Sequence, residues 1–122
     1  MAEQFSNAPA PSREEFEDLA EHLEWKYLGS ASTGSGNSVN LPSEFNEICC
    51  IGSASAGMEY NRIMTIPAAF LDSTTRYFYV GNYATSTSGQ SFNITATKTK
   101  VTIYGYFEDG SSRTGYMKVY YR

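Results

Sequence analysis

The sequence predicts a mostly β protein: an antiparallel β-sandwich or jelly-roll-like domain, preceded by one short amphipathic N-terminal helix. Aromatic residues make up 15% of the 122 residues and charged residues only 18%, a mixture that suits strands and polar turns. After Trp25 the apolar residues follow a period of two, and turn-forming clusters separate the short runs. Such strands are typical of a sandwich. We therefore expect a sandwich domain at residues 25–122, after a flexible leader and short helix at residues 1–24.

The helix is predicted from its first turn and its apolar stripe. Ser12 and Glu15 have the spacing of a capping box, in which each side chain bonds the backbone amide of the other residue. Phe16, Leu19 and Leu23 then recur on one side of a helix that ends near residue 24. So short a stripe does not hold a coiled coil by itself, and we expect these three residues in or near a subunit interface.

Eight strands are expected after the helix. Asp109-Gly110 is the sharpest hairpin signal, because this pair readily adopts positive φ. The expected strands are Trp25–Ser30, Ser38–Leu41, Glu47–Ser53, Arg62–Pro67, Arg76–Tyr83, Ser91–Thr97, Val101–Glu108 and Tyr116–Tyr121.

Alternation within these strands predicts which side chains face the core. In the seventh strand, Val101, Ile103 and Phe107 are expected on one face, and the tyrosines on the other. So many outward tyrosines fit either the ordinary outer surface of amphipathic strands, with cross-strand pairing, or an interface. An interface suits their chemistry because Tyr brings a large contact area at low entropic cost. The tyrosines expected opposite the aliphatic residues are Tyr77, Tyr79, Tyr104, Tyr106 and Tyr120.

Two adjacent cysteines, Cys49 and Cys50, lie in the middle of an apolar strand. Successive side chains of a strand point to opposite faces, so the two sulfur atoms do not easily bridge each other. The chain has no third cysteine, and its one histidine, His22, lies on the predicted helix, so we expect no metal site. The two cysteines are interpreted as small packing residues of a strand that is covered on both faces.

The overall charge excludes some classes of partner. The formal net charge is −4, the pI is about 4.9, and no basic patch is present, so we expect no nucleic-acid binding. The apolar runs are far shorter than a membrane span, and no signal peptide precedes the domain. We expect synthesis in a cytoplasm and no membrane insertion.

No arrangement of residues predicts catalysis or a cofactor. The sequence contains neither a P-loop nor a G-x-S-x-G elbow. A glycan-active enzyme fragment would need paired carboxylates facing one cleft. The acidic residues of the domain instead lie in or beside predicted turns: Glu44, Glu47, Glu59, Asp72, Glu108 and Asp109. We therefore expect a protein that is not an enzyme.

The domain resembles the C-terminal modules of tail- or head-fibre-like virion appendage proteins of bacteriophages and prophages of gut bacteria. The segments that carry the resemblance are "WKYLGSASTGSGNSVNLPSEFNEI", "MTIPAAFL", "TRYFYVGNY", "KVTIYGYF" and "MKVYYR". The resemblance implies a non-enzymatic structural protein of the virion, made in the cytoplasm of the host bacterium. It also implies a homotrimer attached to other virion proteins through its N-terminus. The module would serve host-surface adhesion or capsid decoration.

Any ligand, such as a host-surface glycan, is expected at the loops Val80–Gln90 and Glu108–Tyr116, since recognition is usually carried by loops. Their candidate ligand-binding residues are Asn82, Tyr83, Arg113 and Tyr116. We expect the end of the sandwich that holds Trp25 to face the virion. A free carbohydrate-binding module is the alternative, and it would need an exposed aromatic platform.

Overall fold

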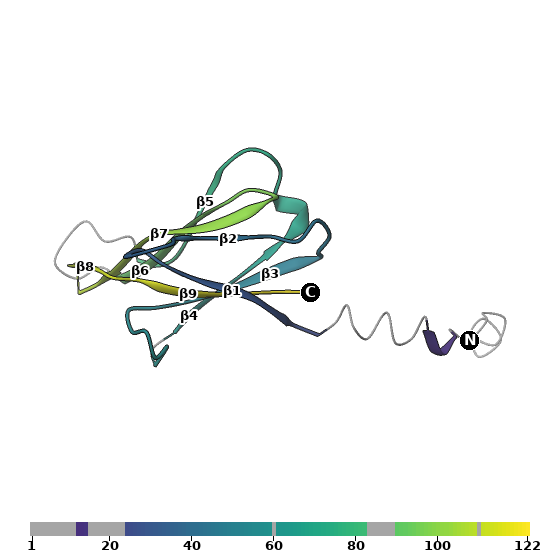
Figure 1. The fold of residues 1–122 in the computed structure, drawn as a ribbon. Coiled ribbons are helices and arrows are strands. Elements are labelled where there is room, and N and C mark those ends of the chain that lie inside the picture. Colours follow the sequence, from purple (N-terminus) through teal and green to yellow (C-terminus); the bar gives the residue numbers. More distant parts are fainter. Residues whose placement is uncertain (1–11, 15–23, 60, 83–89, 110) are drawn as a thin grey trace, which may run out of the picture.

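The computed structural model describes residues 12–14, 24–59, 61–82, 90–109 and 111–122, with the side chain of Asn82 excepted. They form two antiparallel sheets packed face to face, which confirms the predicted β-sandwich (Figure 1). The strands are β1 (Lys26–Ser32), β2 (Ser38–Asn40), β3 (Glu47–Ser53), β4 (Arg62–Pro67), β5 (Arg76–Asn82), β6 (Gln90–Ala96), β7 (Lys100–Glu108), β8 (Ser111–Arg113) and β9 (Tyr116–Tyr121), with a short 3-10 turn, η1 (Ala68–Phe70), after β4.

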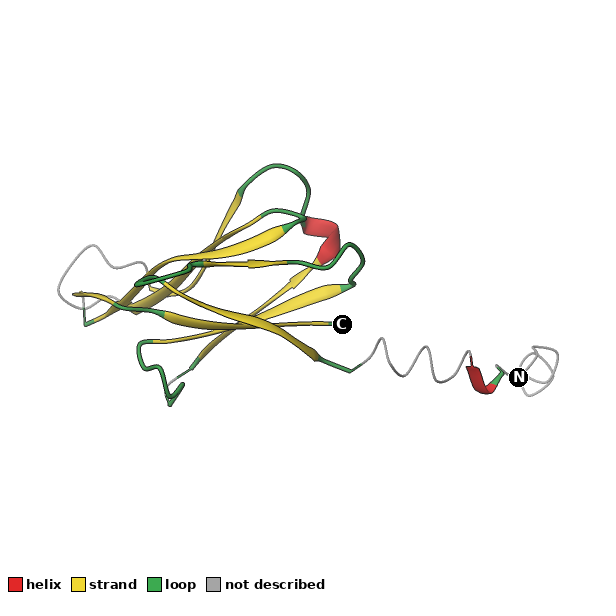
Figure 2. Cartoon of the chain, viewed as in Figure 1, coloured by secondary structure: helices red, strands yellow, loops and turns green. Residues whose placement is uncertain are grey.

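The strand order combines long-range pairs with local hairpins. Sheet A has the order β1-β9-β3-β4, and sheet B the order β2-β7-β6-β5, with β8 also paired to β7. The β1–β9 and β2–β7 pairs join the two halves of the chain. In contrast, β3 with β4 and β5 with β6 are neighbours in sequence as well as in the sheet. All these ladders are antiparallel, so loops gather at the two ends of the sandwich (Figure 2).

Most of the predicted elements are present. Every expected strand is observed within two residues of its predicted ends, and three of them, β3, β4 and β9, have the predicted bounds. Asp109 has φ +51°, as the hairpin prediction requires. Arg13 and Glu14 have helical backbone, but residues 15–23 lie outside the described part, so the N-terminal helix stays a prediction. No helix among the described residues is long and apolar enough to span a membrane.

The core lies between the sheets, and its largest fully buried side chain is that of an aromatic residue. Phe92 of β6 is fully buried, and its ring lies 6.2 Å from that of Tyr106, measured between centroids. It also packs on Gly52 of β3, where a Cβ atom would lie only 2.6 Å from the ring. The other large apolar side chains that are fully buried come from both sheets: Ile48, Cys50, Ile66, Ile94, Val101, Ile103, Met117 and Val119.

One predicted side-chain direction is wrong. Tyr106 was expected on the outer face, but it is only 4% exposed and faces Phe92 in the core. The reason is a β-bulge: Asn93 pairs with Gly105 while its neighbour Ile94 pairs with Ile103, so Tyr104 is an extra residue in β7. A bulge shifts the alternation by one residue. Phe107, which was expected in the core, is consequently only partly buried.

The two cysteines lie on opposite faces of β3, as predicted, and neither forms a disulfide. Cys50 is fully buried in the core, where burial raises the pKa of its thiol to about 12. Cys49 is on the outer face of sheet A and only partly buried. Burial also raises the pKa of Cys49, while a hydrogen bond with Thr65 opposes this shift. The outer face of β3 is therefore less completely covered than the sequence predicted.

These environments predict different thiol reactivities. The thiolate is the reactive form, so Cys50 should be unreactive toward Ellman's reagent in the native protein and reactive only after denaturation. Cys49 should react slowly in the native state. The Cys49→Ser variant should therefore show no native-state labelling, while the matched Cys50→Ala variant keeps the slow reaction. Rapid labelling of native Cys49→Ser protein would contradict the burial of Cys50.

Candidate binding surfaces

The two ends of the sandwich differ in what they hold. One end carries Trp25 and the C-terminal Arg122, whose guanidinium carbon lies 4.3 Å from the centre of the indole ring. β1 begins at this end (Figure 1). The β7–β8 hairpin and the described flanks of residues 83–89 lie at the other end. We call these the proximal end and the distal end.

The structure places the predicted ligand-binding residues at the distal end as far as it describes them. Arg113 is the last residue of β8 and is exposed, and Tyr116 begins β9 and is partly buried. Asn82 ends β5, where its backbone pairs with Gln90. Tyr83 lies outside the described residues, as do the predicted interface residues Phe16, Leu19 and Leu23. The two predicted recognition segments therefore end at the same pole of the domain.

A polar contact ties the two sheets together at the distal end. The Nη2 group of Arg62, at the start of β4, donates a hydrogen bond to Oε1 of Gln90, at the start of β6. Gly81 lies beside this contact with φ +107°, and a Cβ atom there would be 2.3 Å from the carbonyl oxygen of Gln90. Glycine is thus required where the chain enters residues 83–89. Gln90, the residue that follows residues 83–89, is therefore held by both sheets.

A second surface lies on the outer face of sheet B, where three tyrosines are exposed. Tyr77, Tyr79 and Tyr104 have 71%, 60% and 45% of their surface exposed. The rings of Tyr77 and Tyr104 meet edge to face, with centroids 5.9 Å apart. We call these three residues the tyrosine face.

A row of hydroxyl groups continues from the tyrosine face across sheet B. Strand register aligns Tyr77 with Thr95, Thr95 with Thr102, and Thr102 with Ser38. The Oγ atom of Ser38 and the Oγ1 atom of Thr102 are 2.7 Å apart and share a hydrogen bond. The row formed by these four residues therefore carries one aromatic ring and three hydroxyl side chains, and none of the four is charged. Such a surface offers ring faces and hydrogen-bonding groups to an uncharged polar ligand.

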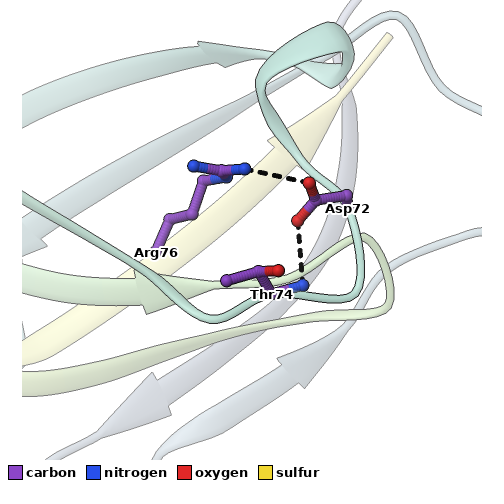
Figure 3. Close-up of polar contacts among 3 residues, drawn as sticks. All are labelled: Asp72, Thr74 and Arg76. Atoms are coloured by element: carbon purple, nitrogen blue, oxygen red, sulfur yellow. Dashed lines mark hydrogen bonds and ion pairs between the residues drawn. The ribbon is translucent and has the colours of Figure 1, made fainter.

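A groove of about 740 Å³ adjoins the tyrosine face between η1 and the start of β5. Phe70 and Tyr77 line it with exposed rings, and Asp72 and Arg76 line it with charged groups. Nη2 of Arg76 donates to Oδ2 of Asp72 at 2.9 Å, and the Thr74 amide donates to Oδ1 at 2.8 Å (Figure 3). Arg76 and the Thr74 amide lower the pKa of the Asp72 carboxyl, so it stays ionised in mildly acidic solution.

The sequence interpretation missed this groove. Asp72 was considered only as an unpaired carboxylate beside a turn, and Phe70 and Arg76 were not singled out. The available signal was the Asp72-Ser73-Thr74 sequence, since an aspartate at the start of a turn commonly bonds the amide two residues later.

A larger groove, about 760 Å³, lies at the proximal end between the β2–β3 connection and the C-terminus. Phe45, Tyr121 and Arg122 line it together with Glu44 and two lysines, Lys26 and Lys98. Trp25 and Arg122 are in contact at this end of the domain. The groove is therefore close to the place where residues 1–24 join the sandwich.

Acid–base or metal chemistry is not indicated by the described residues. Among them, no group of three or more His, Cys, Asp or Glu side chains is placed to hold a metal ion. The pKa shifts described above belong to the two cysteines and Asp72, and the Asp72 carboxyl is bound by an arginine, not by a second carboxylate.

The chain matches no protein-family model, no curated protein and no solved structure. The fold class is that of a two-sheet antiparallel β-sandwich. The resemblance to phage appendage modules remains a prediction from the sequence.

Proposed function

We propose that this chain is a non-enzymatic structural protein of a bacteriophage virion, a fibre-like module that acts by binding alone. Residues 1–24 attach it to other virion proteins or to sister subunits, and the distal end contacts the host surface. The observation that carries the proposal is the separation of the two ends. β1, which follows residues 1–24 in the chain, begins at the proximal end, while the described flanks of both predicted recognition segments lie at the distal end (Figure 1).

The proposal includes a homotrimer. The outer face of sheet A supports self-association, because it exposes Tyr27 and Ile63 by 56% and 59% beside the partly buried Ile51 and Cys49. Exposed apolar patches of this kind often mark interfaces. The predicted stripe of Phe16, Leu19 and Leu23 would add to this contact. Light scattering that shows a stable monomer at micromolar concentration would contradict the trimer.

Host-surface adhesion is tested by the double substitution Tyr83→Ala and Tyr116→Ala. The two tyrosines belong to the predicted recognition segments, so the variant should bind less to cells of gut bacteria and to their extracted surface polysaccharide. Its thermal stability should be nearly unchanged. Trp25→Ala, at the opposite end of the sandwich, is the control and should retain cell binding. If the parent protein binds no host surface, capsid decoration becomes the better account, and immunogold labelling of virions would locate the protein.

A free carbohydrate-binding module is the second candidate function. The tyrosine face favours it, because exposed aromatic rings next to hydroxyl groups suit a sugar. Immunogold labelling separates the two candidates, since a free module would be absent from purified virions.

A further inference from the structure

We propose that the groove beside η1 and the adjoining tyrosine face form a binding site for a neutral saccharide chain. This site is separate from the distal end and goes beyond the proposed adhesion through the loops. Its components are the rings of Phe70 and Tyr77, the ion pair of Asp72 with Arg76, and the row of hydroxyl groups that begins at Thr95.

The aromatic components are rigidly placed although they are exposed. Phe70, 62% exposed, belongs to η1, and three backbone hydrogen bonds hold this turn and the residues that follow it. The amides of Ala68, Leu71 and Lys98 donate to the carbonyls of Asn46, Ala68 and Asp72, respectively. Tyr77 is held separately by the pairing of β5 with β6, where it lies opposite Thr95. Exposed rings on a fixed backbone lose little entropy on binding. They therefore form a preorganised platform for the apolar C–H face of a sugar ring.

The ion pair supplies the polar half of the site. A carboxylate only accepts hydrogen bonds and a guanidinium only donates them, and here the two stand side by side at the groove. Each hydroxyl of a sugar both donates and accepts, so two neighbouring hydroxyls fit an acceptor and a donor at once. The side chains of Asp72 and Arg76 are 54% and 47% exposed, which leaves both accessible (Figure 3). Charge-assisted hydrogen bonds of this kind are stronger than neutral ones.

The charge of the site selects among ligands. Asp72 compensates Arg76, so the groove offers no net positive charge to an acidic polysaccharide or a phosphate backbone. The net charge of −4 also disfavours polyanions. A second copy of this chain is better suited to the outer face of sheet A, where Tyr27 and Ile63 are exposed and Ile51 is partly buried. A neutral saccharide is the ligand that uses both the rings and the ion pair.

The test is affinity electrophoresis of the full chain in gels that contain one polysaccharide each. A soluble cellulose-type glucan, a mannan and a galactan serve as neutral probes, and alginate serves as the acidic probe. We expect retardation by at least one neutral probe and none by alginate. Tyr77→Ala and Phe70→Ala should each weaken that binding about tenfold, as loss of an aromatic anchor commonly does. Asp72→Asn should weaken it roughly fivefold, because the charge-assisted bonds are lost.

Two controls make the result specific to this site. Trp25→Ala removes an exposed ring that does not line this groove and should not change retardation. The distal double variant Tyr83→Ala and Tyr116→Ala should also bind the polysaccharide as the parent does, so failure of distal adhesion and failure of this site are distinguishable. Absence of retardation by every neutral probe, retardation by alginate alone, or an equal loss in Trp25→Ala would overturn the proposal.

Discussion

Phe92→Ala is expected to lower the free energy of unfolding by about 3–5 kcal/mol, the usual cost of truncating a buried phenylalanine. Phe92 is fully buried at the centre of sheet B, and its ring bridges to Gly52 on the facing sheet. Gly52 has no side chain that could move into the space, so the cavity would remain largely open. Because a domain of this size is stable by only about 5–15 kcal/mol, such a loss is a large part of the total.

Urea unfolding followed by far-ultraviolet circular dichroism measures this loss. Phe70→Ala is the matched control, because it removes the same ring from a site that is 62% exposed. The control should change the free energy of unfolding by no more than about 0.5 kcal/mol. A cost for Phe92→Ala close to that of the control would mean that the two sheets do not meet at this ring.

The strands are predictable from the sequence because their signals are local. Residues such as Ile48 and Cys50 alternate with less buried neighbours in β3, and turn residues bound the run on both sides. β8 was missed for the same reason. Its three residues are exposed and polar, so no alternation indicates a strand, and it pairs with β7 only because the Asp109-Gly110 turn reverses the chain.

The direction of Tyr106 and the groove at η1 depend on contacts between distant residues. The bulge at Tyr104 arises from the pairing of β6 with β7, and the sequence marks it only by Gly105. Likewise, the groove exists because the Asp72 carbonyl accepts a bond from the Lys98 amide, which fixes the β4–β5 connection against the β6–β7 turn. Periodicity describes one strand at a time, so it does not report such contacts.

The distal end is predictable from the sequence to a smaller extent than the strands and to a larger extent than the groove at η1. Loop positions follow from the strands, and the described flanks of residues 83–89 and the β7–β8 hairpin lie at the pole opposite Trp25. The contact of Arg62 with Gln90 was not predictable, because it joins the two sheets through side chains.

Gly52→Ala is expected to destabilise the protein by about 1–3 kcal/mol or more, although it adds only one methyl group. The new Cβ atom would lie 2.6–2.7 Å from three atoms of the Phe92 ring, which is closer than real carbon contacts permit. The strand has little freedom to withdraw, because β3 is paired with β4 on one side and with β9 on the other. The ring is also confined, since Tyr106 packs beside it.

A double-mutant cycle identifies this contact as the cause. In the Phe92→Ala background the space beside residue 52 is empty, so Gly52→Ala should cost almost nothing there, and the two losses should fall short of additivity by about 1 kcal/mol or more. Gly34→Ala is the control, because its Cβ atom would meet its nearest neighbour at an ordinary 3.5 Å. Its effect should stay within about 0.5 kcal/mol. Additive losses for the Gly52 and Phe92 substitutions, measured by urea unfolding of all four proteins, would show that the methyl group acts through strain elsewhere in β3.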